Sequence, residues 1–222
     1  MSSNDLFPAQ LLETLEAEAV LAVLTVDKAE NAVPLAKALF EGGVRAMELA
    51  WRTDATLDAL RLIRKEVPDM LAGIGTILTA DQLKQVRDEG AAFAVSPGLS
   101  PKLLDAAGEI GLPYAPAVAT PSEVQVAAEY GCKLLKFFPA EPMGGLKYLN
   151  SMNAPFAHLG LKYIALGGLN QDNAGTYLDS PAIAVLGGSW IAQPDLIQSG
   201  NWSEIKSRAE KIRALIDSKR GN

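Results

Sequence analysis

Lys136 is the residue of this 222-residue sequence whose surroundings best suit covalent chemistry. It lies in the stretch KLLKFFPAE at 133–141, where Leu135, Phe137 and Phe138 make the segment read as a buried strand. Lysine is among the residues least often fully buried. Its amine could extend to solvent from a strand end. Alternatively, burial favours the neutral amine, which is a nucleophile. The stretch by itself leaves both interpretations open.

Glu48 is a lone carboxylate in a second apolar segment, RAMELAW at 45–51. Arg52 follows closely and could neutralise it, and the planar guanidinium of Arg52 could also bind a substrate carboxylate. The functional interpretation of Glu48 is a general acid and base. A lysine amine and a carboxylate in an apolar site are the groups needed for Schiff-base chemistry on a carbonyl compound, because the iminium withdraws electrons while the carboxylate moves protons.

Two glycine pairs follow the last two apolar segments, in ALGGLN at 165–170 and VLGGSW at 185–190. Glycines at such turns expose backbone N–H groups that can bind phosphate. A tight turn between a strand and a helix also needs glycine, so one pair would be weak evidence. Two pairs after consecutive strands favour a phosphate site at Gly167, Gly168, Gly188 and Ser189.

Eight apolar segments could be the strands that position these residues. Their apolar residues are nearly continuous, which is typical of strands covered on both faces. They lie at 19–26, 44–51, 71–78, 91–97, 112–118, 133–138, 162–168 and 182–188. Helical patterns lie between them at 29–41, 55–66, 79–89, 100–110, 120–130 and 171–180, and extra helices are expected before residue 18 and after residue 200.

This alternation predicts an α/β fold, a single (β/α)8 TIM barrel with an extra N-terminal helix, over residues 1–222 as one domain. The alternative is an open doubly wound sheet, which usually has fewer strands and often a GxGxxG turn that is missing after the first segment here. A barrel carries its site at the C-terminal ends of the strands. The residues selected by that rule are Glu48, Trp51, Arg52, Gly75, Thr76, Ser96, Pro97, Gly98, Lys136, Phe138, Gly167, Gly168, Gly188 and Ser189.

Local signals support the helix boundaries. Thr120 before Pro121, with Glu123 three positions after Thr120, predicts a capping box with proline at the first helical position. Glycines that follow helices and precede strands are expected to be left-handed. These are Gly42, Gly90, Gly111 and Gly131.

Composition excludes several classes of function. The net charge of −6 argues against a nucleic-acid or anionic-membrane partner. The single cysteine, Cys132, cannot form an internal disulfide and is expected to be buried. The single histidine, His158, is expected to be an ordinary loop residue, since zinc sites draw several ligands from His and Cys. Neither a signal peptide nor a membrane span is evident, so a cytoplasmic protein is expected.

Six segments taken in order resemble the class I 2-keto-3-deoxy-6-phosphogluconate (KDPG) aldolases, a family that includes 4-hydroxy-2-oxoglutarate (KHG) aldolases. They are AVPLAKALFEGGVRAMELAWRT, GIGTILTADQ, FAVSPGLSP, KFFPAE, GGLN and GGSWIA, and the resemblance covers about residues 12–215. It implies a lyase of the Entner–Doudoroff route that cleaves KDPG to pyruvate and glyceraldehyde 3-phosphate. It also implies a homotrimer that needs no metal or other cofactor.

The resemblance also implies roles for individual residues. Lys136 would form the Schiff base with the substrate C2 carbonyl, and Glu48 would be the general acid and base, working through a water. Phe138 would pack beside the imine. Arg52, Thr76 and the backbone of Gly75 and Pro97 would surround the pyruvyl carboxylate. The phosphate of the aldehyde half would lie on Gly167, Gly168, Gly188 and Ser189.

Two departures from the family pattern concern the aldehyde half of the substrate. Many relatives carry arginine at the end of the first strand, where this chain has Thr25, and PTGG where this chain has ALGG. Leu166 therefore replaces a hydroxyl residue and cannot hydrogen-bond a substrate hydroxyl. The galactonate epimer of KDPG and KHG are alternative substrates. A phosphate-barrel isomerase or epimerase, and a ligand-binding barrel without catalysis, are the alternatives from other classes.

Overall fold

The structure is a computed structural model that describes residues 6–221. Residues 1–5 and 222, which include the start of the segment searched for a targeting signal, lie outside the described residues. All strand pairs are parallel and form one sheet. Its strands are β1 (Val20–Leu24), β2 (Ala46–Ala50), β3 (Leu71–Gly75), β4 (Ala94–Val95), β5 (Tyr114–Ala115), β6 (Ala117–Val118), β7 (Leu134–Phe137), β8 (Lys162–Leu166) and β9 (Ile183–Gly188).

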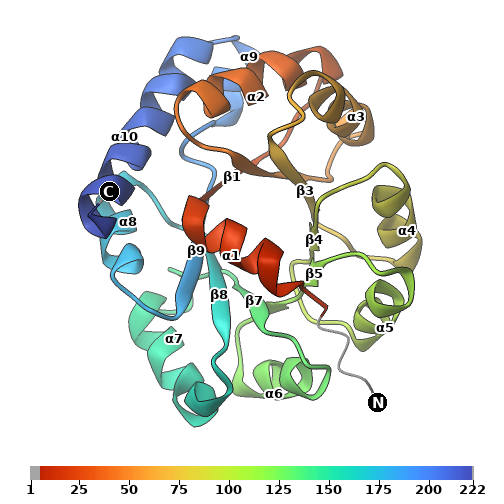
Figure 1. Ribbon diagram of the computed structural model, residues 1–222, viewed down its shortest axis with the longest axis vertical. Coiled ribbons are helices and arrows are strands. Elements are labelled where there is room, and N and C mark those ends of the chain that lie inside the picture. The colour runs from red at the N-terminus through yellow and green to blue at the C-terminus, as the bar shows by residue number, and fades with distance from the viewer. Residues whose placement is uncertain (1–5, 222) are drawn as a thin grey trace.

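The sheet closes into a barrel because its two outermost segments belong to one interrupted strand. The strand order is β5-β4-β3-β2-β1-β9-β8-β7-β6, and only Pro116 separates β5 from β6. Proline has no backbone N–H and interrupts a ladder, but the Pro116 carbonyl still accepts a hydrogen bond from the backbone N–H of Lys136 at 2.8 Å. The predicted barrel of eight strands is confirmed, with the predicted strand 112–118 in two pieces. Figure 1 shows the strands at the centre and most helices around them.

Each predicted helical pattern corresponds to a helix, and the described residues add two α-helices and one 3-10 helix. The α-helices are α1 (Ala9–Glu18), α2 (Ala32–Glu41), α3 (Thr56–Glu66), α4 (Ala80–Asp88), α5 (Pro101–Ile110), α6 (Pro121–Glu129), α7 (Gly145–Asn153), α8 (Gln171–Leu178), α9 (Pro194–Gln198) and α10 (Trp202–Arg220), and the 3-10 helices are η1 (Ala29–Asn31) and η2 (Ala154–Leu159). The sequence patterns do not predict α7 or α9. Helix α7 begins at a glycine pair, which disfavours helix, and α9 is too short to show a helical period.

Helix α1 closes the N-terminal end of the barrel, as the expected extra helix. Phe7 and Leu15 are buried in one apolar cluster with Leu21, Phe93 and Leu134, which lie at or near the starts of their strands. Figure 1 shows α1 lying across the centre of the strands. This end of the barrel is therefore filled, and the opposite end is left for a site, as the fold requires.

The capping box of α6 is confirmed. The Thr120 hydroxyl accepts from the backbone N–H of Glu123 at 3.4 Å, and the Glu123 carboxylate accepts from the backbone N–H of Thr120 at 2.9 Å. Two otherwise unpaired N–H groups at the helix start are thus satisfied.

The glycine predictions hold at three positions and are wrong at Gly42. Gly90, Gly111 and Gly131 have φ of 73°, 68° and 78°, but Gly42 has φ of −79° and its neighbour Gly43 takes the left-handed conformation at 86°. Gly42 is glycine for another reason. A Cβ there would lie 2.5 Å from the Cβ of Ala209, so the close approach of α10 excludes any side chain.

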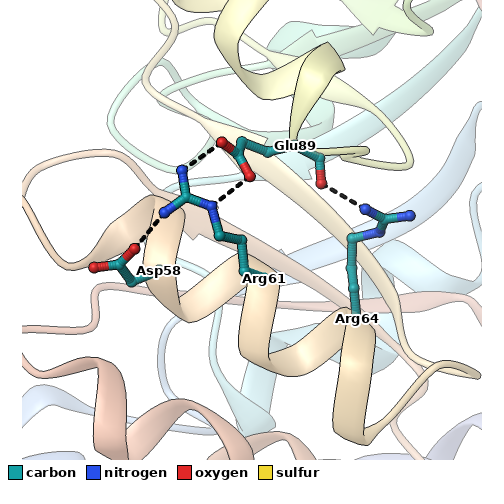
Figure 2. A network of polar contacts seen from close by, with 4 residues as sticks. All are labelled: Asp58, Arg61, Arg64 and Glu89. Atoms are coloured by element: carbon teal, nitrogen blue, oxygen red, sulfur yellow. Dashed lines mark hydrogen bonds and ion pairs between the residues drawn. The ribbon is translucent and has the colours of Figure 1, made fainter.

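A polar network on the outside of the barrel ties α3 to the end of α4 (Figure 2). The guanidinium of Arg61 donates to the carboxylates of Asp58 and Glu89, and Arg64 donates to the backbone carbonyl of Glu89 at 2.7 Å. The hydrogen bond from Arg61 is the main cause that lowers the pKa of the Glu89 carboxyl. Half or more of the Arg61 and Asp58 side chains is exposed to solvent, so the network fixes the geometry of two helices rather than adding much stability.

The single cysteine and the single histidine lie in different environments, Cys132 in the core and His158 on the surface. Cys132 is buried, as expected. His158 lies in the 3-10 helix η2 rather than in a loop. The sequence did not predict this helix, because a short 3-10 turn has no apolar period. Within residues 6–221, no helix is both long and apolar enough to cross a membrane.

Candidate active site

Lys136 and Glu48 form a buried ion pair inside the barrel. The Nζ of Lys136 lies 3.1 Å from Oε1 and 3.4 Å from Oε2 of Glu48, and the two residues are 4% and 1% exposed. The amine therefore does not extend to solvent, and within the described residues Glu48 is paired with Lys136 rather than with Arg52. Burial favours a neutral amine, while an adjacent carboxylate favours the ammonium. The carboxylate is also placed to accept the proton that the amine must lose before it can act as a nucleophile.

The alternation of side chains along the strands explains why these two residues meet. Ala46 of β2 and Leu134 of β7 belong to the cluster that fills the N-terminal end of the barrel. Side chains two residues apart on a strand point to the same face. Glu48 and Lys136 therefore point inward as well, one layer closer to the C-terminal end. The barrel brings together residues that are 88 positions apart in the chain.

Gly75 provides the space that the Glu48 carboxylate occupies. It is paired with Ala50 on the adjacent strand, and a Cβ at position 75 would lie 1.8 Å from Oε1 of Glu48 and 2.5 Å from its Cδ. Any other residue would displace the carboxylate. Gly75, predicted to present its backbone to a substrate carboxylate, thus has a packing role that the sequence does not reveal.

We expect Gly75→Ala to lower kcat/KM for the reaction at this site about a hundredfold. The added Cβ would displace the Glu48 carboxylate, and a displacement of roughly 1 Å of a catalytic group can have that effect. Gly108→Ala is the matched control, because a Cβ at Gly108 of α5 would have its nearest neighbour at 3.4 Å. The two variants are compared by steady-state kinetics and thermal unfolding. Equal activities of the two folded variants would contradict this role of Gly75.

Phe138 connects the ion pair with a cavity at the C-terminal end of the barrel. The Nζ of Lys136 lies 5.5 Å from the centroid of the Phe138 ring, and Phe138 lines the cavity. An ammonium over an aromatic face is attracted by the ring quadrupole. The ring also lies against one side of the amine.

The cavity has a volume of about 320 Å³ and collects most of the predicted binding residues. Arg52, Phe138, Gly167, Gly168, Gly188 and Ser189 line it. Sequence reasoning did not select the other lining residues, which are Val23, Leu24, Thr25, Ala50, Leu166, Leu169, Gly187, Ala192 and Pro194. Leu166 and Thr25 had a signal, because they depart from the family pattern. The others are small or apolar residues, which carry no chemical signal in a sequence.

Thr76 and Pro97 follow the ends of neighbouring strands but lie outside the lining of this cavity. Thr76 has φ of 65°, an uncommon conformation for a β-branched residue. Strain of this kind gathers at functional sites. Pro97 is exposed and follows Ser96, whose hydroxyl accepts from Tyr114 at 2.6 Å and donates to the Gly98 carbonyl at 2.5 Å.

The two glycine pairs differ in conformation. Gly167 and Gly168 have φ of 104° and 83° and form a turn that only glycine adopts readily. Gly187 and Gly188 are instead the last residues of β9, and their lack of side chains serves packing. A Cβ at Gly188 would lie 1.6 Å from the ring of Trp190. The prediction of two equivalent glycine turns is therefore wrong for the second pair.

Acidic and metal-ligating side chains are sparse around the cavity. In the part of the chain that the structure describes, no three His, Cys, Asp or Glu side chains are grouped so that they could hold a metal ion. The groups at hand for chemistry are the lysine amine, the carboxylate, the guanidinium of Arg52 and backbone N–H groups. Together they can bind an anionic carbonyl compound and carry out carbonyl and proton-transfer chemistry on it.

Comparison with known proteins points to one family. Residues 11–208 match the family described as KDPG and KHG aldolase. The chain is similar to the KHG/KDPG aldolase of Escherichia coli strain K12, with 42% identity over 86% of this chain and 89% of that one. It is also similar to the 2-dehydro-3-deoxy-phosphogluconate aldolase of Dickeya dadantii, with 41% identity over 91% of this chain and 94% of that one.

A similar solved structure is that of the KDPG aldolase of Legionella pneumophila, with pyruvate captured as a covalent carbinolamine intermediate. It superimposes with a TM-score of 0.85 and 36% identity, covering 90% of this chain and 96% of that one. Fold and sequence thus agree in the relatives that they identify.

Proposed function

Because this chain belongs to the family of KDPG and KHG aldolases, we propose that Lys136 and Glu48 are the catalytic pair of a KDPG aldolase. The enzyme is a carbon–carbon lyase of class I, the class that works through a Schiff base, and its substrate is KDPG. The observation that carries the residue assignment is the buried contact of 3.1 Å between Nζ and Oε1 at the C-terminal end of the barrel.

The proposed reaction begins at the amine of Lys136. The neutral amine attacks the C2 carbonyl of KDPG and gives a carbinolamine, and loss of water gives the iminium. The Legionella relative, captured with pyruvate as a carbinolamine, supports this order of events. Phe138, which packs beside the amine, shields the intermediate from water on that side.

Glu48 is proposed to move the protons of the bond-breaking step. The C4 hydroxyl loses its proton to the carboxylate, directly or through a water, and the C3–C4 bond breaks as its electrons flow into the iminium. Glyceraldehyde 3-phosphate leaves, the remaining enamine is protonated at C3, and hydrolysis of the resulting imine releases pyruvate and regenerates Lys136. One carboxylate, that of Glu48, is proposed to serve both proton transfers, from the C4 hydroxyl and to C3.

The two ends of the substrate are proposed to bind to different walls of the site. Arg52, with Thr76 and the backbone of Gly75 and Pro97, is assigned to the pyruvyl carboxylate. The phosphate is assigned to the glycine turn Gly167–Gly168 together with Gly188 and Ser189. The position of Arg52, the glycines and Ser189 around one cavity supports the assignment.

Incubation with radiolabelled pyruvate and borohydride tests the mechanism, since reduction traps an imine on the protein. The expected result is one labelled peptide that contains Lys136. A phosphate-barrel isomerase or a non-catalytic binding protein would give no such adduct and no release of pyruvate from KDPG.

Cleavage of the galactonate epimer of KDPG, or of KHG, is a second candidate activity. The observation that favours it is Leu166, which lines the cavity and has no hydroxyl to offer to the substrate. The Escherichia coli relative is named for both KHG and KDPG. Side-by-side cleavage rates on the three purified substrates, followed by pyruvate release, would rank them.

We expect Leu166→Thr to change the ratio of kcat/KM for KDPG to that for its galactonate epimer about tenfold, since one gained or lost hydrogen bond has an effect of that size. Leu215→Thr, at a partly buried position of α10, is the matched control and should leave the ratio unchanged. An unchanged ratio in Leu166→Thr would refute contact of Leu166 with the substrate.

The remaining proposals concern the state of the protein in the cell. We propose a cytoplasmic homotrimer in which residues 1–222 form one barrel domain. The trimer is what the resemblance to the KDPG and KHG aldolases implies. Sedimentation velocity on the purified chain would give the number of subunits, and a single cooperative unfolding transition would support one domain.

A further inference from the structure

The glycine turn Gly167–Gly168 is held from one side by the loop that follows β7. The backbone N–H of Ala140 donates to the Leu166 carbonyl at 2.8 Å, and that of Glu141 donates to the Gly167 carbonyl at 2.9 Å. The two loops are in close contact, because a Cβ at Gly168 would lie 2.6 Å from the Cβ of Glu141. Every contact of the turn on this side therefore depends on where the β7 loop lies.

These hydrogen bonds also orient the N–H groups of the turn. The C=O and N–H of one planar trans peptide point in opposite directions. When Glu141 fixes the Gly167 carbonyl, it also fixes the N–H of Gly168. The side chain of Asn173, at the start of α8, donates to the Gly168 carbonyl at 3.2 Å and orients the next peptide in the same way.

The cavity is lined by the turn itself but not by the two residues that hold its carbonyls. Gly167 and Gly168 are among its described lining residues, and Glu141 and Asn173 lie outside that set. The carbonyls are thus held away from the cavity, and the N–H groups are left to face it. A turn prepared in this way binds an anion without having to reorganise.

Tyr177 fixes the side chain of Glu141. Tyr177 lies on α8 and is 2% exposed, and its hydroxyl donates to Oε1 of Glu141. Burial, and then the hydrogen bond to Glu141, raise the pKa of this hydroxyl, so it remains a donor. Gly145 leaves room for the pair, because a Cβ there would lie 2.8 Å from Oε1 of Glu141 and 3.1 Å from the hydroxyl of Tyr177.

We propose that Tyr177 and Glu141 are positioning residues for the anionic group of the substrate. The hydroxyl of Tyr177 holds Glu141, Glu141 holds the Gly167 carbonyl, and the N–H of Gly168 is thereby aimed into the cavity. The inference rests on the proposed function, which places the phosphate of KDPG at this turn. It adds a role for two residues that do not touch the substrate.

Tyr177→Phe tests the proposal, with two reactions as readouts. Cleavage of KDPG needs the phosphate site, whereas exchange of the pyruvate C3 protons with solvent needs only Lys136 and Glu48. We expect the KM for KDPG to rise about five- to tenfold, the effect of losing one hydrogen bond, with proton exchange unchanged. Tyr163→Phe is the matched control, because the hydroxyl of this buried tyrosine of β8 donates to Asn153 at 2.8 Å instead.

Variants of Glu141 give a second, independent test. Glu141 is exposed, so its substitution should not prevent folding. Glu141→Gln keeps an acceptor for Tyr177 and should keep the KM within about twofold of the wild type, whereas Glu141→Ala should reproduce Tyr177→Phe. An unchanged KM in Tyr177→Phe and Glu141→Ala would overturn the inference. So would a loss of proton exchange equal to the loss of cleavage, which would mean a merely structural role.

The wild type separates this inference from the proposed function. A wild-type protein that neither cleaves KDPG nor exchanges the pyruvate protons would overturn the proposed function and the inference with it. An active wild type beside a Tyr177→Phe variant of equal KM would overturn the inference alone.

Discussion

Lys136→Met is expected to lower kcat for KDPG cleavage by at least about 10⁴-fold, the scale on which loss of a covalent nucleophile acts. The methionine side chain is similar in length and apolar, so it fills the space of the lysine in the barrel. Because no amine remains, no carbinolamine or iminium can form. Borohydride should then trap no labelled pyruvate on the protein, and pyruvate release should fall to the background.

Lys133→Met is the control that the chain itself offers. Lys133 lies just before β7, is exposed, and donates to the Leu159 carbonyl at 3.2 Å, outside the barrel. We expect this variant to keep wild-type kinetics and to be labelled by pyruvate. A labelled adduct on Lys136→Met, or its loss on Lys133→Met alone, would place the Schiff base at another lysine.

Glu48→Gln is expected to lower kcat by about 10² to 10⁴-fold, the usual contribution of a general acid and base. The amide keeps the size of the carboxylate and can still contact Nζ of Lys136, but it cannot accept a proton. Cleavage and exchange of the pyruvate C3 protons should fall together, since both need proton transfer. Trapping of pyruvate should still be possible on long incubation, because Lys136 remains.

Glu41→Gln serves as the control for this change. Glu41 is exposed at the end of α2 and pairs with Lys206 of α10 at 3.0 Å, so its carboxylate lies on the surface rather than in the barrel. Wild-type exchange of the pyruvate protons in Glu48→Gln would show that another group moves the proton. Loss of both trapping and exchange would indicate that Glu48 is also essential for forming the carbinolamine.

Both single variants should also be less stable, because each leaves one member of the buried pair without its opposite charge. Removal of one partner of such a pair typically costs about 3–5 kcal/mol of unfolding free energy, whereas replacing both partners can be neutral. The double variant Lys136→Met with Glu48→Gln should therefore be more stable than the sum of the single effects predicts. Urea unfolding of the wild type and the three variants measures this coupling and shows whether an inactive variant is folded.

Much of the barrel could be predicted from the sequence, because its signals are local. Near-continuous apolar runs mark strands that are covered on both faces, and Thr120 with Glu123 marks a helix start. Helix α7 escapes this reasoning, since a glycine pair at its start carries the signal of a turn. The fifth strand is interrupted at Pro116. Whether an adjacent strand needs a backbone N–H donor at that position is a property of the closed sheet.

The chemistry of the site was also accessible, because it depends on residue types that are unusual in their surroundings. A lysine and a glutamate inside apolar strands require an explanation wherever they lie. Alternation along each strand, combined with the rule for barrel sites, then gives the face and the end of the barrel. The family resemblance supplied the roles that these two arguments leave open.

The fold class, the strands and the residues able to do chemistry thus follow from local pattern and side-chain type, which can be read along the chain. Which groups meet is a property of the folded barrel. Glu48 meets Lys136 at 3.1 Å, the Glu48 carboxylate lies over Gly75, and Tyr177 contacts Glu141 behind the glycine turn. These contacts depend on closure of the barrel and on how closely neighbouring segments pack. The spacing of residues along the chain does not encode how closely these segments pack.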